Sequence, residues 1–209
     1  MGDEYKTEQE AFWAGEFGSG YIERNRGAGL LAANLAFFNS ALRCARAPTD
    51  CIEFGANIGM NLQALKLLYP QQLQFAIEIN TEAVNLLQGI VPAENVYHAS
   101  ILGFEPARTY DLVLIKGVLI HVNPDCLSQV YDALYRSTGR YLLVCEYYNP
   151  SPVAIPYRGH SDRLFKRDFA GELLDRYQDL SLIDYGFSYH RDANFPQDDI
   201  TWFLMERRD

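Results

Sequence analysis

The sequence predicts an α/β fold in which helices cover a mostly parallel β-sheet whose last strand runs antiparallel. Three observations support this prediction. Short apolar runs alternate with segments of helical periodicity, which is typical of βαβ units. A glycine turn at residues 55–59 joins one apolar run directly to a helical segment. Two β-like runs, at 180–185 and 201–206, have no helical pattern between them, so we expect a final hairpin.

The remaining elements follow from the same two periodicities. Strands are predicted where short runs of apolar residues are bounded by turn-forming residues: 51–54, 73–79, 95–98, 112–116 and 141–146. Helices are predicted where apolar residues recur every three or four positions: 30–47, 58–69, 81–88, 127–135 and 169–177. With the final hairpin, the predicted sheet has seven strands.

Residues 1–29 precede the first predicted element of this core and are rich in aromatic side chains. Thr7 and Glu10 have the spacing of a capping box, which predicts the start of a short helix. We expect the glycines of the segment 18–20 to break this helix and to act as a hinge. Two interpretations remain open: the segment packs on the domain, or it forms a lid over a ligand. The predicted division is a lid segment at 1–29 and one domain at 30–209.

The composition restricts the class of protein. A chain of 209 residues with a formal net charge of −9 is disfavoured as a general nucleic-acid binder, because such binding requires cations. No apolar run is long enough to span a bilayer, and the four cysteines and four histidines show no metal-binding spacing. We therefore expect a cytoplasmic protein, monomeric or homodimeric, that acts on a small molecule without a metal, a nucleic acid or a membrane.

The glycine turn has the features of a nucleotide-binding site. Glu53 lies two residues before Gly55, and Glu78 ends the next apolar run. Glycine allows the backbone to approach a ligand closely, and an acid about 20 residues after such a turn can accept both ribose hydroxyls. A dinucleotide fingerprint requires a glycine where this chain has Asn57, so a pyrophosphate ligand is disfavoured.

The turn EFGANIG at residues 53–59 resembles motif I of the class I S-adenosylmethionine (SAM) methyltransferases. The segment YDLVLIKGVLIHV at 110–122 resembles the fourth strand and the following turn of the same family. The resemblance implies a Rossmann-like fold in which the glycine turn wraps the methionine part of SAM and Glu78 holds the ribose. It also implies that the end of the fourth strand lies against the transferred methyl group.

We expect SAM to contact several elements at once. Aromatic faces suit its sulfonium, a guanidinium suits its carboxylate, and residues just past the third strand would flank adenine. The expected SAM-binding residues are Trp13, Tyr21, Arg24, Glu53, Gly55, Ala56, Asn57, Gly59, Glu78, Ile79, Ser100, Ile101, Lys116 and Gly117.

The segment after the fifth predicted strand is locally basic. Residues 149–168 contain four lysines and arginines but only two acids, and guanidinium groups match carboxylates and phosphates. We therefore expect an anionic substrate, unless these cations pair with acidic surface elsewhere. The expected substrate-binding residues are Tyr147, Asn149, Tyr157, Arg158, His160 and Arg163. For catalysis we expect His121 as a base, with Glu146 and Tyr148 as further candidates by position; a structural role for His121 is the alternative.

The full chain also resembles one branch of this family, the pseudaminic acid biosynthesis-associated methylases. The residues that carry this resemblance are TEQEAFW at 7–13, GYIERN at 20–25, IEFGANIG at 52–59, PYRGH at 156–160, LFKRDFAG at 164–171, YHRD at 189–192 and FPQDD at 195–199. The resemblance implies methylation of a small anionic molecule, such as a nonulosonic-acid sugar or its precursor. Azetidine-2-carboxylate synthases, which cyclise SAM and release methylthioadenosine, resemble the same branch and remain an alternative. A non-catalytic SAM-binding module is a further alternative for the function.

Overall fold

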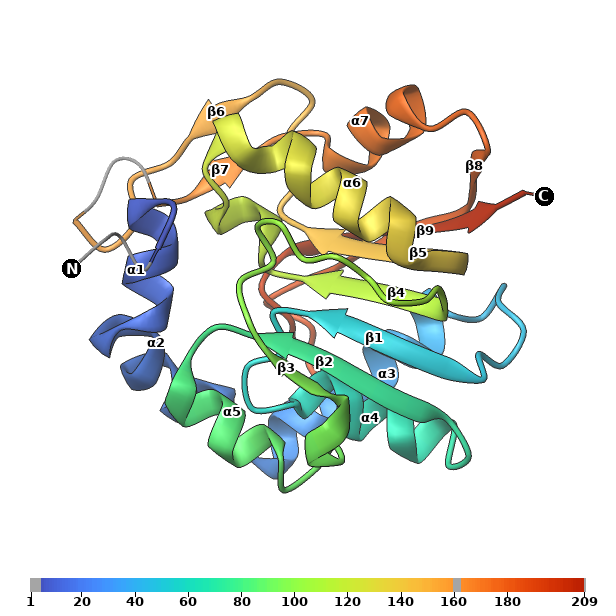
Figure 1. The fold of residues 1–209 in the computed structure, drawn as a ribbon. Coiled ribbons are helices and arrows are strands. Elements are labelled where there is room, and N and C mark those ends of the chain that lie inside the picture. The colour runs from blue at the N-terminus through green and yellow to red at the C-terminus, as the bar shows by residue number, and fades with distance from the viewer. Residues whose placement is uncertain (1–4, 160–162, 209) are drawn as a thin grey trace.

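The computed structural model describes residues 5–159 and 163–208. A seven-stranded sheet in the order β3-β2-β1-β4-β5-β9-β8 forms its centre, as Figure 1 shows. β1 to β5 pair in parallel, whereas β9 runs antiparallel between β5 and β8, which confirms the predicted fold class. The strands are β1 (Asp50–Phe54), β2 (Leu73–Glu78), β3 (Val96–His98), β4 (Tyr110–Lys116), β5 (Thr138–Glu146), β8 (Leu180–Ser188) and β9 (Ile200–Arg207).

Helices cover both faces of this sheet (Figure 1). One face carries α3 (Ala28–Ala41), α4 (Met60–Leu68) and α5 (Thr81–Leu87), and the other carries α6 (Leu127–Ser137) and α7 (Phe169–Arg176). Side chains of β4 alternate between the two layers because successive residues of a strand point to opposite faces. Leu112 and Leu114 belong to the core under α3 and α4, whereas Val113 and Ile115 belong to the core under α6 and α7.

Four predicted helices are shorter in the structure, α5 and α7 by one residue each and α3 and α4 by more. α3 ends at Ala41 rather than at residue 47, because Leu42, with a φ of −105° and a ψ of 9°, leaves helical backbone and the chain turns over the next residues. α4 begins at Met60, two residues later than predicted. Gly59, with a φ of +79°, has left-handed backbone and cannot be part of the helix.

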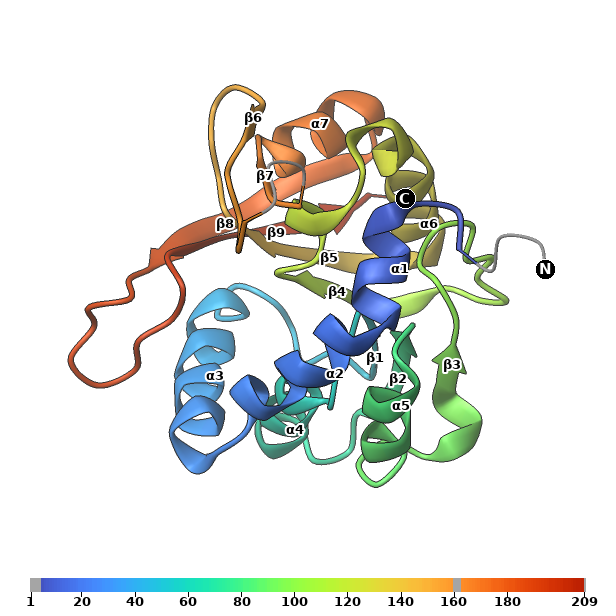
Figure 2. The ribbon, with the colours of Figure 1, turned by 90° about the vertical axis from the view of Figure 1, so that its left-hand side faces the viewer.

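The N-terminal segment, residues 5–25, contains α1 (Glu8–Ala14), α2 (Glu16–Tyr21) and the short 3-10 helix Ile22–Asn25. The predicted capping box is present: Thr7 Oγ1 accepts from the Glu10 N–H, and the Glu10 carboxylate accepts from the Thr7 N–H. Figure 2 shows α1 and α2 crossing the edge of the sheet at which β1, β2 and β4 end.

The predicted break at residues 18–20 is wrong, since these residues lie inside α2 and the helices separate at Gly15, which has extended backbone. Gly18 does not break the helix, but the packing around it leaves no room for a side chain. An added Cβ would lie 1.8 Å from the Trp13 carbonyl oxygen and 3.0 Å from Asn80 Nδ2. Its absent side chain therefore permits a close approach between α2 and the start of α5.

The chain between β5 and α7 also contains structure that the sequence did not predict. A two-stranded antiparallel sheet forms from β6 (Val153–Ala154) and β7 (Phe165–Lys166).

Three further 3-10 helices, outside this segment, span Ala93–Asn95, Leu119–His121 and Pro124–Cys126. Among the described residues, no helix is long and apolar enough to cross a membrane.

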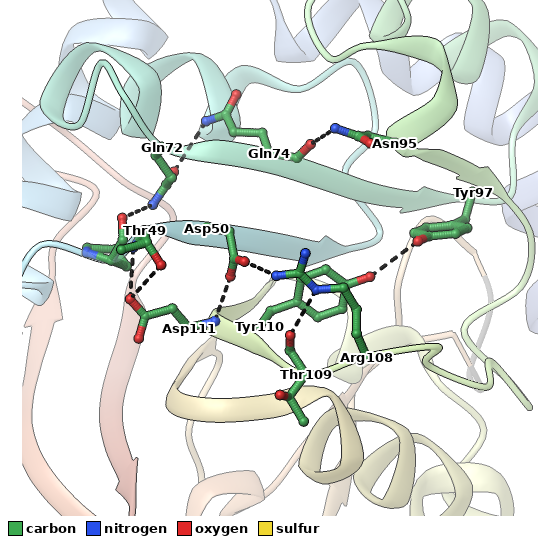
Figure 3. A network of polar contacts seen from close by, with 11 residues as sticks. Thr49, Asp50, Gln72, Gln74, Asn95, Tyr97, Arg108, Thr109, Tyr110 and Asp111 are labelled. Atoms are coloured by element: carbon green, nitrogen blue, oxygen red, sulfur yellow. Dashed lines mark hydrogen bonds and ion pairs between the residues drawn. The ribbon is translucent and has the colours of Figure 1, made fainter.

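A polar network fixes the amino ends of β1 and β4, at the edge opposite the N-terminal segment. Figure 3 shows Asp50 accepting from the Arg108 guanidinium and from the Asp111 N–H, the latter at 2.7 Å. The Asp111 carboxylate in turn accepts from the Thr49 N–H at 2.8 Å. Each acidic side chain thus binds backbone or side chain of the neighbouring element, which holds the register of the two central strands.

Candidate functional site

A cavity of about 260 Å³ lies between the N-terminal segment and the carboxyl edge of the sheet. Its wall is formed by the turns and loops that follow β1, β2, β3, β4 and β5, by the segment before β9, and by the N-terminal segment itself. The chain progresses outward from β1 in one direction and from β4 in the other, so the cavity lies at the topological switch point. Open α/β sheets bind their ligands at this point.

The backbone N–H groups of the glycine turn after β1 indicate which kind of ligand the turn can bind. The five N–H groups of residues 55–59 all donate within the protein. Those of Gly55 and Ala56 donate to the Ile77 carbonyl oxygen, and that of Asn57 donates to the Glu78 carboxylate at 2.7 Å. A pyrophosphate would require free N–H groups from such a turn, so this conformation is unsuited to a dinucleotide.

The same turn packs tightly on the turn after β4. Gly55 has a φ of +75°, and an added Cβ would lie 2.7 Å from the Val118 side chain. Asn57 also has left-handed backbone, with a φ of +48°, which asparagine tolerates better than most residues. A glycine is therefore required at position 55 for two reasons, and the two turns together form one continuous part of the cavity wall.

Glu78, at the end of β2, is buried and lines the cavity. One carboxylate oxygen accepts from the N–H groups of Ile79 (2.8 Å) and Asn80 (2.7 Å), and the other accepts from the Asn57 N–H. Burial raises the pKa of Glu78, while the three N–H groups oppose that rise. Because a carboxylate has about four acceptor positions, one remains on Oε2 for a ligand hydroxyl.

Glu53 is completely buried beneath the turn and does not line the cavity. One of its carboxylate oxygens accepts from Asn61 Nδ2 at 2.6 Å, whereas the other has no hydrogen-bond partner among the described residues. Burial raises its pKa to about 8. Lys116, at the end of β4, does line the cavity, and burial lowers its pKa. Among the described residues of the wall, Lys116 is the only lysine or arginine.

Five aromatic side chains contact one another in a closed circuit, which we call the aromatic roof: Trp13, Phe17, Tyr21, His121 and Tyr157. Trp13 lies 5.3 Å from Tyr21 and 4.7 Å from His121, measured between ring centroids. Tyr157 lies 5.3 Å from His121 and 6.2 Å from Phe17, and Phe17 lies 6.3 Å from Tyr21. All but Phe17 line the cavity. The N-terminal segment, the turn after β4 and the loop after β5 thus meet over the cavity.

His121, the expected base, lies in this roof and lines the cavity. Its Nδ1 is 2.6 Å from the Arg163 carbonyl oxygen, so Nδ1 carries the hydrogen and Nε2 is left as an acceptor. Burial lowers the pKa of His121 to about 4. The imidazole is therefore neutral near pH 7 and is a weak base.

The other two expected catalytic groups have structural positions. Glu146 is buried, does not line the cavity, and accepts from the N–H groups of Val118 (3.0 Å) and Leu119 (2.9 Å). Burial raises its pKa to about 7. Tyr148 is 43% exposed, lies outside the cavity wall, and its ring is 6.0 Å from that of Phe203. Glu146 holds the turn after β4, so the structure gives neither residue access to a ligand in this cavity.

The expected SAM-binding residues lie largely together. Those that line the cavity are Trp13, Tyr21, Gly55, Ala56, Asn57, Glu78, Ile79, Ser100, Ile101, Lys116 and Gly117. Glu53 and Gly59 lie outside the wall, the first beneath the turn and the second at the start of α4. Arg24 is exposed and also lies outside the wall, with its guanidinium 5.9 Å from the Tyr21 ring centroid.

The expected substrate-binding residues are divided. Tyr147 and Tyr157 line the cavity, whereas His160 lies outside the described residues. Arg163 forms an ion pair with Glu8 at 2.9 Å, and Arg158 lies 5.8 Å from the Phe17 ring centroid. Neither arginine lines the cavity, and Asn149 donates to the Ser151 carbonyl oxygen of its own loop. These contacts hold the loop after β5 in place and attach it to the N-terminal segment.

Several polar residues of the wall had no predicted role, among them Asn80, Glu10 and Asp198. Asn80 Nδ2 lies within hydrogen-bond distance of the Trp13, Ala14 and Gly15 carbonyl oxygens, at 3.2 to 3.4 Å, and so holds the N-terminal segment. Glu10 accepts a hydrogen bond from the Ser100 hydroxyl. Asp198 precedes β9 and lies in the motif FPQDD, which carried a resemblance but no assigned role.

The sequence matches no protein-family model and no curated protein sequence. Similar solved structures include the plantazolicin methyltransferase BpumL in complex with SAH, at 13% identity and a TM-score of 0.64 over 96% of this chain and 94% of that one. A second is the 1,6-didemethyltoxoflavin-N1-methyltransferase of Burkholderia thailandensis, at 16% identity and a TM-score of 0.68 over 100% and 94%.

A third is the magnesium protoporphyrin IX methyltransferase ChlM from Synechocystis PCC 6803 with bound SAM, at 12% identity and a TM-score of 0.66 over 99% of this chain and 100% of that one. Each of these three similarities extends over 96% or more of this chain. The chain therefore has the fold of the class I SAM-dependent methyltransferases.

Proposed function

We propose that this protein is a SAM-dependent methyltransferase that acts on a small molecule. The observation that carries the proposal is the cavity at the topological switch point, in which Glu78 and the turn at 55–59 meet. The N–H groups of this turn already donate to acceptors within the protein, so the turn favours a nucleoside ligand that has no pyrophosphate. The neighbours of known structure with bound SAM or SAH support the same conclusion.

The residues present fit this group. Glu78 would accept from a ribose hydroxyl at its remaining acceptor position, and Ser100 and Ile101 would flank the adenine. The turn at 55–59 would surround the methionine part, which glycine at position 55 allows. When bound, SAM supplies a methyl group on a cationic sulfur, and the faces of the aromatic roof suit that charge.

Lys116 replaces Arg24 as the proposed partner of the SAM carboxylate. Arg24 is exposed and lies outside the cavity wall, whereas Lys116 lies in the wall beside the glycine turn. The charge of Asp198, which lies in the same wall, is among those that raise the pKa of Lys116 and so favour its ammonium form. The methionine carboxylate would add a hydrogen-bonded counter-charge in the same place.

The substrate expected from the sequence was an anionic sugar acid of the pseudaminic-acid type. Its support was the basic segment 149–168, whose described cations have other partners. Arg163 binds Glu8, Arg167 binds Glu172 at 2.6 Å, and Lys166 lies 5.0 Å from the Tyr147 ring centroid. A nonulosonic-acid substrate therefore remains a hypothesis drawn from the resemblance alone.

One observation favours a second candidate, the cyclisation of SAM to azetidine-2-carboxylate. Four rings of the aromatic roof line the cavity, and Asn80 and Arg163 hold the N-terminal segment that carries three of the five rings. Rings placed around the sulfonium would limit the access of an external acceptor to it. The amine of SAM would then be the nucleophile and methylthioadenosine the leaving product.

The test is to incubate the purified protein with SAM and no acceptor and to analyse the products by liquid chromatography and mass spectrometry. Intact SAM that is converted to SAH only on addition of an acceptor supports methyl transfer. Methylthioadenosine with an azetidine amino acid, formed faster than SAM decays without protein, assigns cyclisation instead. Absence of SAM binding would contradict both and leave an interaction module.

A further inference from the structure

Asp198 faces the cavity from the segment that precedes β9, on the side away from Glu78 in the strand order. Tyr21, Tyr147 and Tyr157 line the same cavity. Burial raises the pKa of all three tyrosines, and the negative charge of Asp198 raises each of them further. The carboxylate is therefore close to three phenol groups that come from the N-terminal segment, the end of β5 and the loop after β5.

The backbone on both sides of Asp198 is fixed. Gln197 is buried, and its Nε2 donates to Asn34 Oδ1 of α3 at 3.0 Å. The Asp199 carboxylate accepts from the His190 N–H at 2.9 Å and lies 2.8 Å from His190 Nδ1, which closes the base of the loop between β8 and β9. Asp198 is thus held in the cavity wall between two anchored neighbours.

The Asp198 side chain itself has no hydrogen bond or ion pair with any described residue. Three carboxylates occur in the described cavity wall, and the other two are engaged: Glu10 by Ser100 and by N–H groups of its own helix start, and Glu78 by three N–H groups. Lys116 lies in the same wall, and the charge of Asp198 raises its pKa, although no ion pair joins the two among the described residues. Asp198 is exposed, so its acceptor positions are open both to solvent and to a ligand in the cavity.

We propose that Asp198 and the three tyrosines form a subsite for an alkylammonium group at the end of the cavity away from Glu78. A carboxylate accepts hydrogen bonds from an ammonium, and the electron-rich faces of tyrosine attract the same cation. This inference rests on the proposed function, and it names the class of the nucleophile, an amine. The bound ammonium must lose one proton, to the Asp198 carboxylate or to solvent, before its lone pair attacks the carbon and the carbon–sulfur bond breaks. The ammonium has two possible sources: a separate amine substrate or the α-ammonium of SAM itself.

Two SAM analogues separate these sources. SAH carries the α-ammonium but lacks the sulfonium charge, whereas sinefungin carries the same α-ammonium and a second ammonium on the carbon that replaces sulfur. We would measure the dissociation constants of both by isothermal titration calorimetry for the wild type, Asp198→Asn and Asp175→Asn. Asp175 is exposed on α7, outside the cavity wall, so its substitution controls for the loss of one negative charge.

For a substrate amine at the acceptor end, Asp198→Asn weakens sinefungin about tenfold or more and leaves SAH unchanged, as expected for one charge-assisted hydrogen bond. For the α-ammonium of SAM, both analogues weaken by the same factor. The thermal unfolding midpoint of Asp198→Asn should equal that of the wild type, since no described hydrogen bond is lost.

Unchanged affinity for both analogues overturns the subsite, and so does an equal loss in Asp175→Asn. Tighter binding of sinefungin by Asp198→Asn than by the wild type overturns it too. These outcomes leave the proposed function intact provided that the wild type binds SAM. A wild type that binds neither SAM nor SAH refutes the proposed function directly.

Discussion

Replacing Glu78 by glutamine tests the proposed ribose contact with the least disturbance of the fold. Glu78 Oε1 accepts two N–H groups, from Ile79 and Asn80, and Oε2 accepts one, from Asn57. The glutamine amide can keep the first pair on its single oxygen. Its NH₂ group then replaces the oxygen that faces the turn and the ligand, so both the Asn57 N–H and a ribose hydroxyl lose their acceptor.

The expected loss is one charge-assisted hydrogen bond to SAM, about 1.5–3 kcal/mol. That corresponds to a dissociation constant raised about 10- to 150-fold. Alanine would be a poorer test because it leaves three N–H groups without an acceptor, at about 1–3 kcal/mol each if they stay buried. Such a total approaches the whole stability of a domain, about 5–15 kcal/mol.

The assay is calorimetric titration of SAM into the wild type, Glu78→Gln and Glu82→Gln. Glu82 is an exposed acid in the first turn of α5 and serves as the matched control. Urea denaturation of each variant verifies that it is folded at the temperature of the titration. If folded Glu78→Gln binds SAM as tightly as the wild type, the ribose assignment is refuted.

Three further predictions concern groups around the cavity. Because burial raises the pKa of Glu53 to about 8, the folded state keeps a proton that the unfolded chain loses above its ordinary value, so stability falls as the pH rises between 5 and 8. Urea denaturation of Glu53→Gln should show a smaller fall, and an equal one would contradict the buried assignment. The ring of His121 should titrate near pH 4 by NMR, with the proton on Nδ1; a midpoint near 6.5 would restore it as a base. Asn80→Asp keeps the cap of α5 but removes the donor to the N-terminal segment, so amide exchange at residues 8–21 should accelerate; unchanged exchange would show that Asn80 does not hold it.

The central sheet was predictable because its signals are local. Each strand from β1 to β5 is a short apolar run beside a helical pattern, and the turn at 55–59 has an unusual glycine spacing. The antiparallel β9 followed from the missing helical pattern before it. Glu78 and Lys116 were identified for the same reason, since residues at the carboxyl ends of parallel strands lie at the edge of the sheet where such folds bind ligands.

The errors arose where a side chain finds a partner distant in sequence. Glu146 has the position of a reactive acid, but the N–H groups of the turn after β4 occupy its carboxylate. The sequence predicted that Arg163 and Arg24 bind the ligand. In the structure, Arg163 binds Glu8, and Arg24 lies outside the cavity wall. Asp198 carries no signal of its own, because only the packing of Gln197 on α3 directs it to the cavity.

The most direct test of the proposed function is a calorimetric titration of the wild-type protein with SAM and, separately, with NAD. We predict that SAM binds and that NAD does not, because the turn at 55–59 has no free N–H group for a pyrophosphate. Binding of NAD without binding of SAM would contradict the assignment of the cavity and the function proposed from it.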